Sequence, residues 1–272
     1  MGIIEFAKSP WGQDVPIHIF FYLIYVAVIA GLAFFIGHVI WLRYFAKKEE
    51  FADSTPPSEV AKLPAEIKRH SLPARLFHWV QAGAMLTLLF SAFLPKVGVR
   101  FEWLQWHWIA GVVLTASIVF HIIHASFFMN FWSIWPDKID IEDAGRRWKR
   151  SQGEKAPAPR RFGKYPMENK MYHLAIVLAG LSVTCTGFFM LFRIRTPLFT
   201  RNSYMFGDMT NGLMYTLHGL AGVGLIALIM IHVYFALRPE KLKISRSMVY
   251  GTIKREHYVE HHDPKRWVAE AE

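Results

Sequence analysis

Two apolar segments that each begin and end with a histidine constrain the fold more than any other feature of the chain. They run from His107 to His121 and from His218 to His232, and they agree at 8 of 15 positions when aligned without gaps. Histidines 14 residues apart on a helix share nearly one face and lie about 21 Å apart along the axis. Each segment therefore places its first imidazole near one edge, and its second near the other edge, of a hydrocarbon layer that is roughly 30 Å thick.

A glycine follows the first histidine of each segment by one helical turn. Gly111 comes four residues after His107, and Gly222 comes four residues after His218. Residues four apart lie above one another on a helix, so the missing side chain leaves room beside the imidazole for a flat ligand. Ionisable residues within a membrane usually face the interior of a bundle and mark a functional site.

Five apolar runs are long enough to cross a bilayer as helices. They cover residues 17–45, 76–94, 105–129, 171–192 and 212–237. The first run is too long for the apolar part of a signal peptide and lacks a small-residue cleavage site, so we expect it to be retained. The sequence predicts an all-α membrane protein, in which a four-helix transmembrane bundle is joined by one extra N-terminal transmembrane helix.

The connections between these runs divide the chain into four parts. We predict an N-terminal transmembrane helix within residues 1–46, a linker at 47–71, the four-helix bundle at 72–238 and a tail at 239–272. The linker contains several prolines and mixed charges, so we expect it to be solvated. Residues 137–164 are polar and rich in Arg, Pro and Lys, which predicts an irregular loop.

Positive charge is concentrated in alternate connections between the spans. The net charge is +10, and 25 of the 31 Lys and Arg residues lie in residues 43–75, residues 138–170 and the tail from Arg238. By the positive-inside rule these segments are cytoplasmic, which predicts a multi-pass protein of a bacterial inner membrane with a periplasmic N-terminus and a cytoplasmic C-terminus. We expect membrane lipids, and no nucleic acid, as the partners of these charges.

Two imidazoles at each membrane depth predict a pair of bis-histidine haems. A low-spin haem iron takes one imidazole on each side of the porphyrin, and facing helices of a bundle can supply both. Cys185 is the only cysteine, and no C-x-x-C-H motif is present, so any haem b is held non-covalently. His107 and His218 occupy matched positions in the repeat, and we predict that they bind an outer haem.

The residues themselves leave the ligands of the inner haem partly open. His232 is one predicted ligand, because it lies 14 residues after His218. His78 and His121 both lie at the inner end of a neighbouring span, so either could be its partner. The symmetry of the repeat favours His121.

From about Arg69 onward the chain resembles the cytochrome b subunit of membrane-bound formate dehydrogenases and its relatives in nickel-iron hydrogenases. The resemblance rests on several stretches in the same order. They are R-L-F-H-W at 75–79, H-W-I-A-G at 107–111, F-G-K-Y at 162–165 followed by K-M at 170–171, L-H-G-L-A-G at 217–222 with I-H-V-Y at 231–234, and H-H-D-P-K-R-W at 261–267. It implies a four-helix bundle that carries two b haems and reacts with quinone on the cytoplasmic side.

The resemblance also implies ligands for each iron. It pairs His107 with His218 at the outer haem and His78 with His232 at the inner one, and His121 becomes the alternative inner ligand. Arg75 lies one turn before His78 and is predicted to bind a haem propionate. The equal alternative for Arg75 is an ordinary positive-inside anchor.

A quinone site is implied near the F-G-K-Y stretch. Pro166 stands where the resemblance leads us to expect a polar side chain, so the quinone contacts are predicted instead for Asn169, Glu168 and His173. A carboxylate and an imidazole can relay protons to a reduced quinone. The alternative for Glu168 is a helix start, where a carboxylate is favoured by the helix dipole.

The N-terminal span has two histidines of its own, His18 and His38. We expect this helix to pack against a partner subunit or to close the quinone groove. The alternative is that the two histidines bind a third haem, although they are 20 residues apart and no repeated glycine accompanies them.

Together these predictions describe a two-haem cytochrome b that carries electrons between a periplasmic partner and quinone. No nicotinamide, flavin or molybdenum motif is found, so oxidation of the substrate would belong to an iron-sulfur subunit and a periplasmic catalytic subunit. The chain itself would then have no substrate-oxidising site, and it could be oligomeric. Two alternatives remain: a stand-alone transmembrane haem b reductase, and a non-haem transporter that uses its histidines for metal ions or protons.

Overall fold

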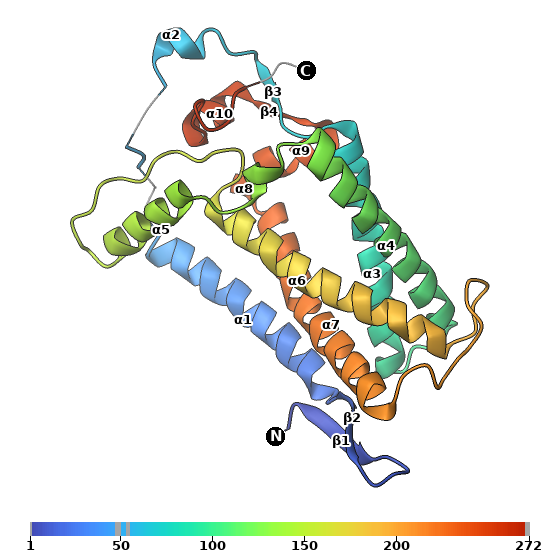
Figure 1. Ribbon diagram of the computed structural model, residues 1–272. Coiled ribbons are helices and arrows are strands. Elements are labelled where there is room, and N and C mark those ends of the chain that lie inside the picture. Colours follow the sequence, from blue (N-terminus) through green and yellow to red (C-terminus); the bar gives the residue numbers. More distant parts are fainter. Residues whose placement is uncertain (1, 47–49, 53–54, 270–272) are drawn as a thin grey trace. The chain divides into compact units, whose positions relative to one another are not determined.

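The computed structural model describes residues 2–46, 50–52 and 55–269 (Figure 1). Parts of the predicted linker (47–49 and 53–54), the last residues of the predicted tail (270–272) and residue 1 lie outside this description. The described chain forms two compact units. The first comprises the described residues within 1–39, 80–119 and 175–232, and the second comprises those within 40–79, 120–174 and 233–272.

Five helices among the described residues are long and apolar enough to cross a membrane. They are α1 (Tyr22–Tyr44), α3 (Leu72–Phe93), α4 (Trp103–Phe128), α6 (Met167–Met190) and α7 (Asp208–Leu237) (Figure 1). Short 3-10 turns extend α3 (Leu94–Val97) and α6 (Leu191–Arg193). A backbone in lipid must satisfy its hydrogen bonds internally, which helices of this length do. The predicted all-α membrane fold is confirmed.

The core of the first unit is built from four of these helices. Ala84 and Met85 of α3 are buried against Leu114 of α4 and Leu225 of α7. Apolar side chains of α6 pack against the same cluster: Ile176, Ala179 and Val183. The predicted four-helix bundle therefore has an apolar centre to which every helix contributes.

Helix α1 touches this bundle at a glycine. A Cβ atom placed on Gly31 would lie 2.8 Å from Cε of Met230 on α7, so the missing side chain allows close approach. Most of the remaining surface of α1 is apolar and exposed, as at Ile29 and Ile36, which is the composition of a lipid-facing helix.

A β-hairpin precedes α1, which corrects the predicted start of the first span at residue 17. Strands β1 (Ile4–Lys8) and β2 (Asp14–Ile19) pair antiparallel. His18 therefore lies on a strand, with its Nε2 atom 3.5 Å from a carboxylate oxygen of Glu5. The hairpin reaches α7 at Gly212, where a Cβ atom would lie only 1.9 Å from the carbonyl oxygen of Pro16. Only glycine fits this backbone approach.

In the second unit, the predicted linker and tail fold together. Strand β3 (Glu66–Lys68) pairs antiparallel with β4 (Thr252–Lys254). Ile67, Ile253 and Tyr258 form a fully buried cluster around this pair. The expectation of a solvated linker is thus wrong at Ile67 and Arg69, which are buried, whereas Glu66 and Lys68 are exposed. The other elements of this unit are α2 (Pro57–Val60), α8 (Pro239–Ser245), α9 (Ser247–Tyr250) and α10 (Arg255–His261).

The predicted irregular loop at residues 137–164 is also wrong in its first half. After the 3-10 turn at Phe131–Ile134, helix α5 spans Lys138–Ser151. Asp137 caps its first turn, because its side chain accepts a hydrogen bond from the Asp140 N–H at 2.9 Å. The Asp140 side chain accepts in return from the Asp137 N–H, which completes a capping box.

Candidate functional site

His107 and His218 lie next to one another inside the first unit. His107 is in the second turn of α4, and His218 is in the third turn of α7. Their ring centroids are 6.1 Å apart, and the ring planes are inclined by 64°. Both side chains are half-buried. The structure therefore brings together the pair that the repeat predicts for the outer haem.

The Nδ1 atom of each of these imidazoles is held by a buried hydroxyl group. Ser91 Oγ on α3 lies 2.9 Å from Nδ1 of His107, and Thr186 Oγ1 on α6 lies 2.9 Å from Nδ1 of His218. Each helix of the bundle thus supplies either an imidazole or the hydroxyl that orients it.

The hydroxyl hydrogens are already used, and this determines the tautomer of each imidazole. Ser91 donates to the Thr87 carbonyl at 2.6 Å, and Thr186 donates to the Ser182 carbonyl at 2.5 Å. A hydroxyl has one hydrogen to donate, so the serine and threonine oxygens accept from the imidazole Nδ1–H groups. The Nε2 atoms then carry the lone pair that binds a metal ion.

The distance between the rings is compatible with one iron that both His107 and His218 would hold. A metal–imidazole bond of about 2 Å, with the ring centroid about 1 Å behind each nitrogen, gives roughly 6 Å between centroids. The observed separation is 6.1 Å. The residues present fit a bis-imidazole iron site in their type and in the separation of their rings.

At both repeat glycines the structure has room for a Cβ atom, in ordinary van der Waals contact with a neighbouring side chain. A Cβ atom on Gly111 would meet only Leu88 within 4 Å, at 3.9 Å, and one on Gly222 would meet only Phe93, at 4.0 Å. A Cβ atom on Gly187 of α6 would lie 3.2 Å from Cε1 of His218. Gly187 thus lets α6 approach the imidazole, a role that the repeat did not indicate.

The predicted inner ligands lie on α3, α4 and α7. His78 is half-buried on α3, with its ring 5.0 Å from that of Trp79. His232 lies near the C-terminal end of α7. These two residues belong to different units, and their pairing stays a prediction.

His121 packs face to face with Phe77 of α3. The ring centroids are 4.2 Å apart, and the planes are inclined by only 7°. This contact buries one face of the imidazole and supports a packing role for His121. Stacking leaves the ring nitrogens available, so His121 stays the alternative inner ligand.

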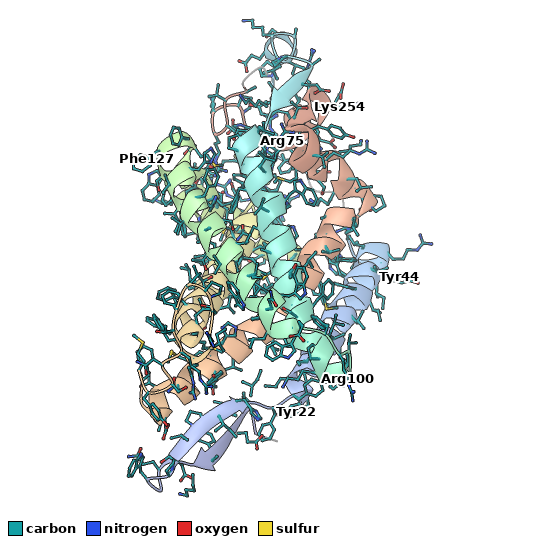
Figure 2. All side chains as sticks on the ribbon, turned by 90° about the vertical axis from the view of Figure 1, so that its right-hand side faces the viewer. Tyr22, Tyr44, Arg75, Arg100, Phe127 and Lys254 are labelled. Carbon is teal, nitrogen blue, oxygen red and sulfur yellow. The ribbon has the colours of Figure 1, made fainter. Side chains whose placement is uncertain are left out.

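Arg75 projects from the first turn of α3 toward the C-terminal segment of the chain (Figure 2). Its Nη1 group donates to the carbonyl of Val249, and Trp79 on the next turn donates to the carbonyl of Met248 at 3.0 Å. These bonds attach α3 to α9. The predicted contact between Arg75 and a haem propionate stays a prediction.

The predicted quinone residues occupy the first two turns of α6. Glu168 and Asn169 are exposed, and Glu168 lies 3.9 Å from a guanidinium nitrogen of Arg147. His173 is half-buried, and its ring is 5.8 Å from that of Trp135. Asn169 and His173 are four residues apart and share a helix face. Their contact with quinone stays a prediction.

An ion-pair network in the second unit fixes α5 to the start of α6, and sequence reasoning missed it. The Lys170 ammonium donates to Asp140 at 2.5 Å, and both side chains are 4% exposed. Arg266 donates to Asp140 at 2.8 Å and to Asp137 at 2.9 Å. Burial raises the pKa of Asp140, but the hydrogen bonds from Lys170 and Arg266 outweigh it, so the pKa is lower than usual.

Comparison with known proteins gives one family match. The family model described as prokaryotic cytochrome b561 matches residues 69–251. The matched region contains α3, α4, α6 and α7 but neither α1 nor the H-H-D-P-K-R-W stretch at 261–267. No curated protein matches the chain.

Proposed function

The chain belongs to the prokaryotic cytochrome b561 family of membrane haem b proteins, and from this premise we propose that it is the membrane-integral subunit of a respiratory oxidoreductase. In this proposal it resembles the cytochrome b of formate dehydrogenases and nickel-iron hydrogenases and carries two haems. Haem b, when bound, supplies one-electron transfer. The contribution of the chain is to hold the haems at two depths of the bilayer.

The observation that carries the proposal is the pairing of His107 and His218. Their rings are 6.1 Å apart, and hydroxyls on two further helices hold both Nδ1 atoms at 2.9 Å. Two interfacial histidines that only met solvent would not need this arrangement. It orients both imidazoles before any ligand binds, which lowers the entropy lost on binding.

We assign the second haem to His78 and His232. His232 lies 14 residues after His218 on the same helix, about 21 Å along the axis. Two haems at this separation would connect one membrane surface with the other. By the positive-inside rule, the basic connections support a periplasmic His107 end and a cytoplasmic His78 end of the bundle.

The proposed partners follow from this orientation. An iron-sulfur subunit and a catalytic subunit would deliver electrons at the periplasmic side. Quinone would be reduced at the cytoplasmic side near Asn169, Glu168 and His173. Glu168 is exposed and His173 is half-buried, so a carboxylate in contact with water and an imidazole farther inside are available to pass protons inward.

A reduced-minus-oxidised spectrum of the purified chain, combined with a pyridine haemochrome count, tests the proposal. Two b haems per chain would support it, and three would require further ligands such as His38. Bound zinc with no visible absorbance would favour the non-haem transporter instead. Co-purification of an iron-sulfur protein would separate the subunit from a stand-alone haem reductase, and oxidation of the reduced haems by a quinone analogue would test the quinone step.

A further inference from the structure

Arg69 is a buried cation between two aromatic rings in the second unit. Its side chain is 4% exposed. The guanidinium carbon lies 5.3 Å from the ring centroid of Tyr165 and 5.5 Å from that of Trp267. Aromatic faces attract a cation, but they do not accept the in-plane N–H bonds that a guanidinium group offers.

No anion compensates this charge among the residues that the structure describes. The Nη1 atom of Arg69 is buried without a hydrogen-bond partner in that part of the chain. The electrostatic partner that favours its charged form is the phenol of Tyr165, which is neutral near pH 7 because burial raises its pKa further. Burial lowers the pKa of Arg69, yet a guanidinium stays charged in proteins. An unpaired buried charge is strongly destabilising.

Lys164 and Arg75 add positive charge near Arg69, whereas the neighbouring His70 is neutral near pH 7. Burial and the positive charges of Arg69, Lys164, His78 and Arg75 lower the pKa of His70 to about 3. The Nε atom of Arg75 is buried and has no hydrogen-bond partner among the described residues. Two guanidinium groups therefore each have an unused donor in the same region.

Gly251 lies at the centre of the cluster formed by Arg69, His70 and Arg75. Its carbonyl oxygen accepts the backbone N–H groups of Arg69 at 2.8 Å and His70 at 2.9 Å. A Cβ atom on Gly251 would lie 3.0 Å from the His70 carbonyl oxygen and 3.3 Å from the guanidinium carbon of Arg75, and its φ of +92° favours glycine. The turn after α9 thus brings Arg69, His70 and Arg75 together, although no carboxylate in the described part of the chain neutralises Arg69.

We propose that Arg69, together with Arg75 and His70, forms a buried binding site for a carboxylate, occupied by a propionate of the haem that His78 binds. The inference rests on the proposed function, because it takes His78 as an iron ligand. A carboxylate would satisfy the free donors of both guanidinium groups by charge-assisted hydrogen bonds. It would also neutralise a cluster that otherwise has an unpaired buried charge.

The test measures the midpoint potentials of the two haems in full-length wild type, Arg69→Gln and Arg69→Lys by spectroelectrochemical titration. A cation near a haem favours the reduced iron, which carries less positive charge. Arg69→Gln is therefore expected to lower the potential of one haem and leave the other unchanged, whereas Arg69→Lys keeps most of the wild-type value. Arg150→Gln is the matched control, because Arg150 is an exposed arginine of the same unit.

Wild-type protein reconstituted with the dimethyl ester of haem b identifies the anion. If a propionate occupies the site, esterification removes its negative charge and raises the potential of that haem. Arg69→Gln then lowers the potential more with the esterified haem than with haem b, because no carboxylate screens the guanidinium charge. A potential that depends instead on added inorganic phosphate, or on phosphatidylglycerol vesicles, would show that a free anion or a lipid headgroup occupies the site and would overturn the assignment.

Two further outcomes separate the inference from the proposed function. Unchanged potentials in Arg69→Gln, with both haems retained, would mean that Arg69 only packs between its aromatic rings. Wild-type protein without haem would instead refute the proposed function. Retention of the haem at His107 is the internal control for folding, because a misfolded variant would lose both haems.

Discussion

Replacing Ser91 by alanine is expected to weaken haem binding at the His107 site without disturbing the bundle. The Ser91 side chain is 2% exposed and accepts a hydrogen bond from Nδ1 of His107 at 2.9 Å. Without it, the imidazole loses the hydroxyl group that fixes its orientation. Removing such a partner of a metal-binding histidine typically weakens metal binding by roughly 10- to 100-fold, or about 1.4–2.8 kcal/mol.

Ser117→Ala is the matched control for this change. Ser117 is also a buried serine within a span, and its hydroxyl donates to the Leu114 carbonyl at 2.8 Å, inside its own helix. The two variants lose a similar volume and a similar bond to the backbone. Any difference between them therefore measures the contact between Ser91 and the histidine.

The assay is the rate of haem transfer from the purified variants to excess apomyoglobin, followed by absorbance. We expect one of two kinetic phases to become roughly 10- to 100-fold faster in Ser91→Ala, whereas Ser117→Ala keeps the wild-type rates. Thr186→Val should accelerate the same phase, because Thr186 orients the opposite imidazole. Equal rates for Ser91→Ala and Ser117→Ala would refute the reasoning.

Four further substitutions test other parts of the account. By haem count, His78→Ala should retain one haem of two, whereas His121→Ala should retain both. The reverse result would make His121, and not His78, the inner haem ligand. Asp140→Asn should lower the unfolding temperature at neutral pH. The pKa of Asp140 in the folded protein is below its usual value. The ionised carboxylate therefore stabilises the fold above about pH 4, and this stabilisation is lost as the pH falls further. The difference from wild type should therefore narrow below about pH 4, and a difference that persists at lower pH would contradict this. Gly187→Ala would place a Cβ atom 3.2 Å from Cε1 of His218, so we expect a shifted haem spectrum, and an unchanged one would show that the ring has room to move.

The spans could be predicted from the sequence because the membrane leaves few alternatives. A segment in lipid must pair its own backbone groups, so length and hydropathy are sufficient to locate a helix. The pairing of His107 with His218 was predictable for a related reason, since matched positions in two similar hairpins meet inside one bundle. The observed pair lies within the first unit, with ring centroids 6.1 Å apart.

Helix α5 and strand β3 were not predicted from the sequence, because each depends on partners far away in the chain. Helix α5 contains many charged residues and looked like a loop, but Asp140 is neutralised by Lys170 and Arg266. Strand β3 consists of three residues, and its partner β4 lies more than 180 positions later in the chain. Local composition carries no signal for such pairings.

The hydroxyl groups at the site were missed for a different reason. Ser91 and Thr186 are two of several serines and threonines within the spans, and others, such as Thr115, bond only to their own helix backbone. Sequence spacing cannot distinguish the hydroxyls that bond to a histidine from those that bond only to their own helix. The hydroxyl and its histidine are 16 residues apart in one hairpin and 32 residues apart in the other. The helix rotations set by core packing decide which hydroxyl meets an imidazole.

The central claim is that His107 and His218 bind the same iron. Haem counts of His107→Ala, His218→Ala and the double variant test it most directly. We predict that each single variant loses one of two haems and that the double variant loses no more than either single one. Full haem content in either single variant, or the loss of a second haem only in the double variant, would contradict it.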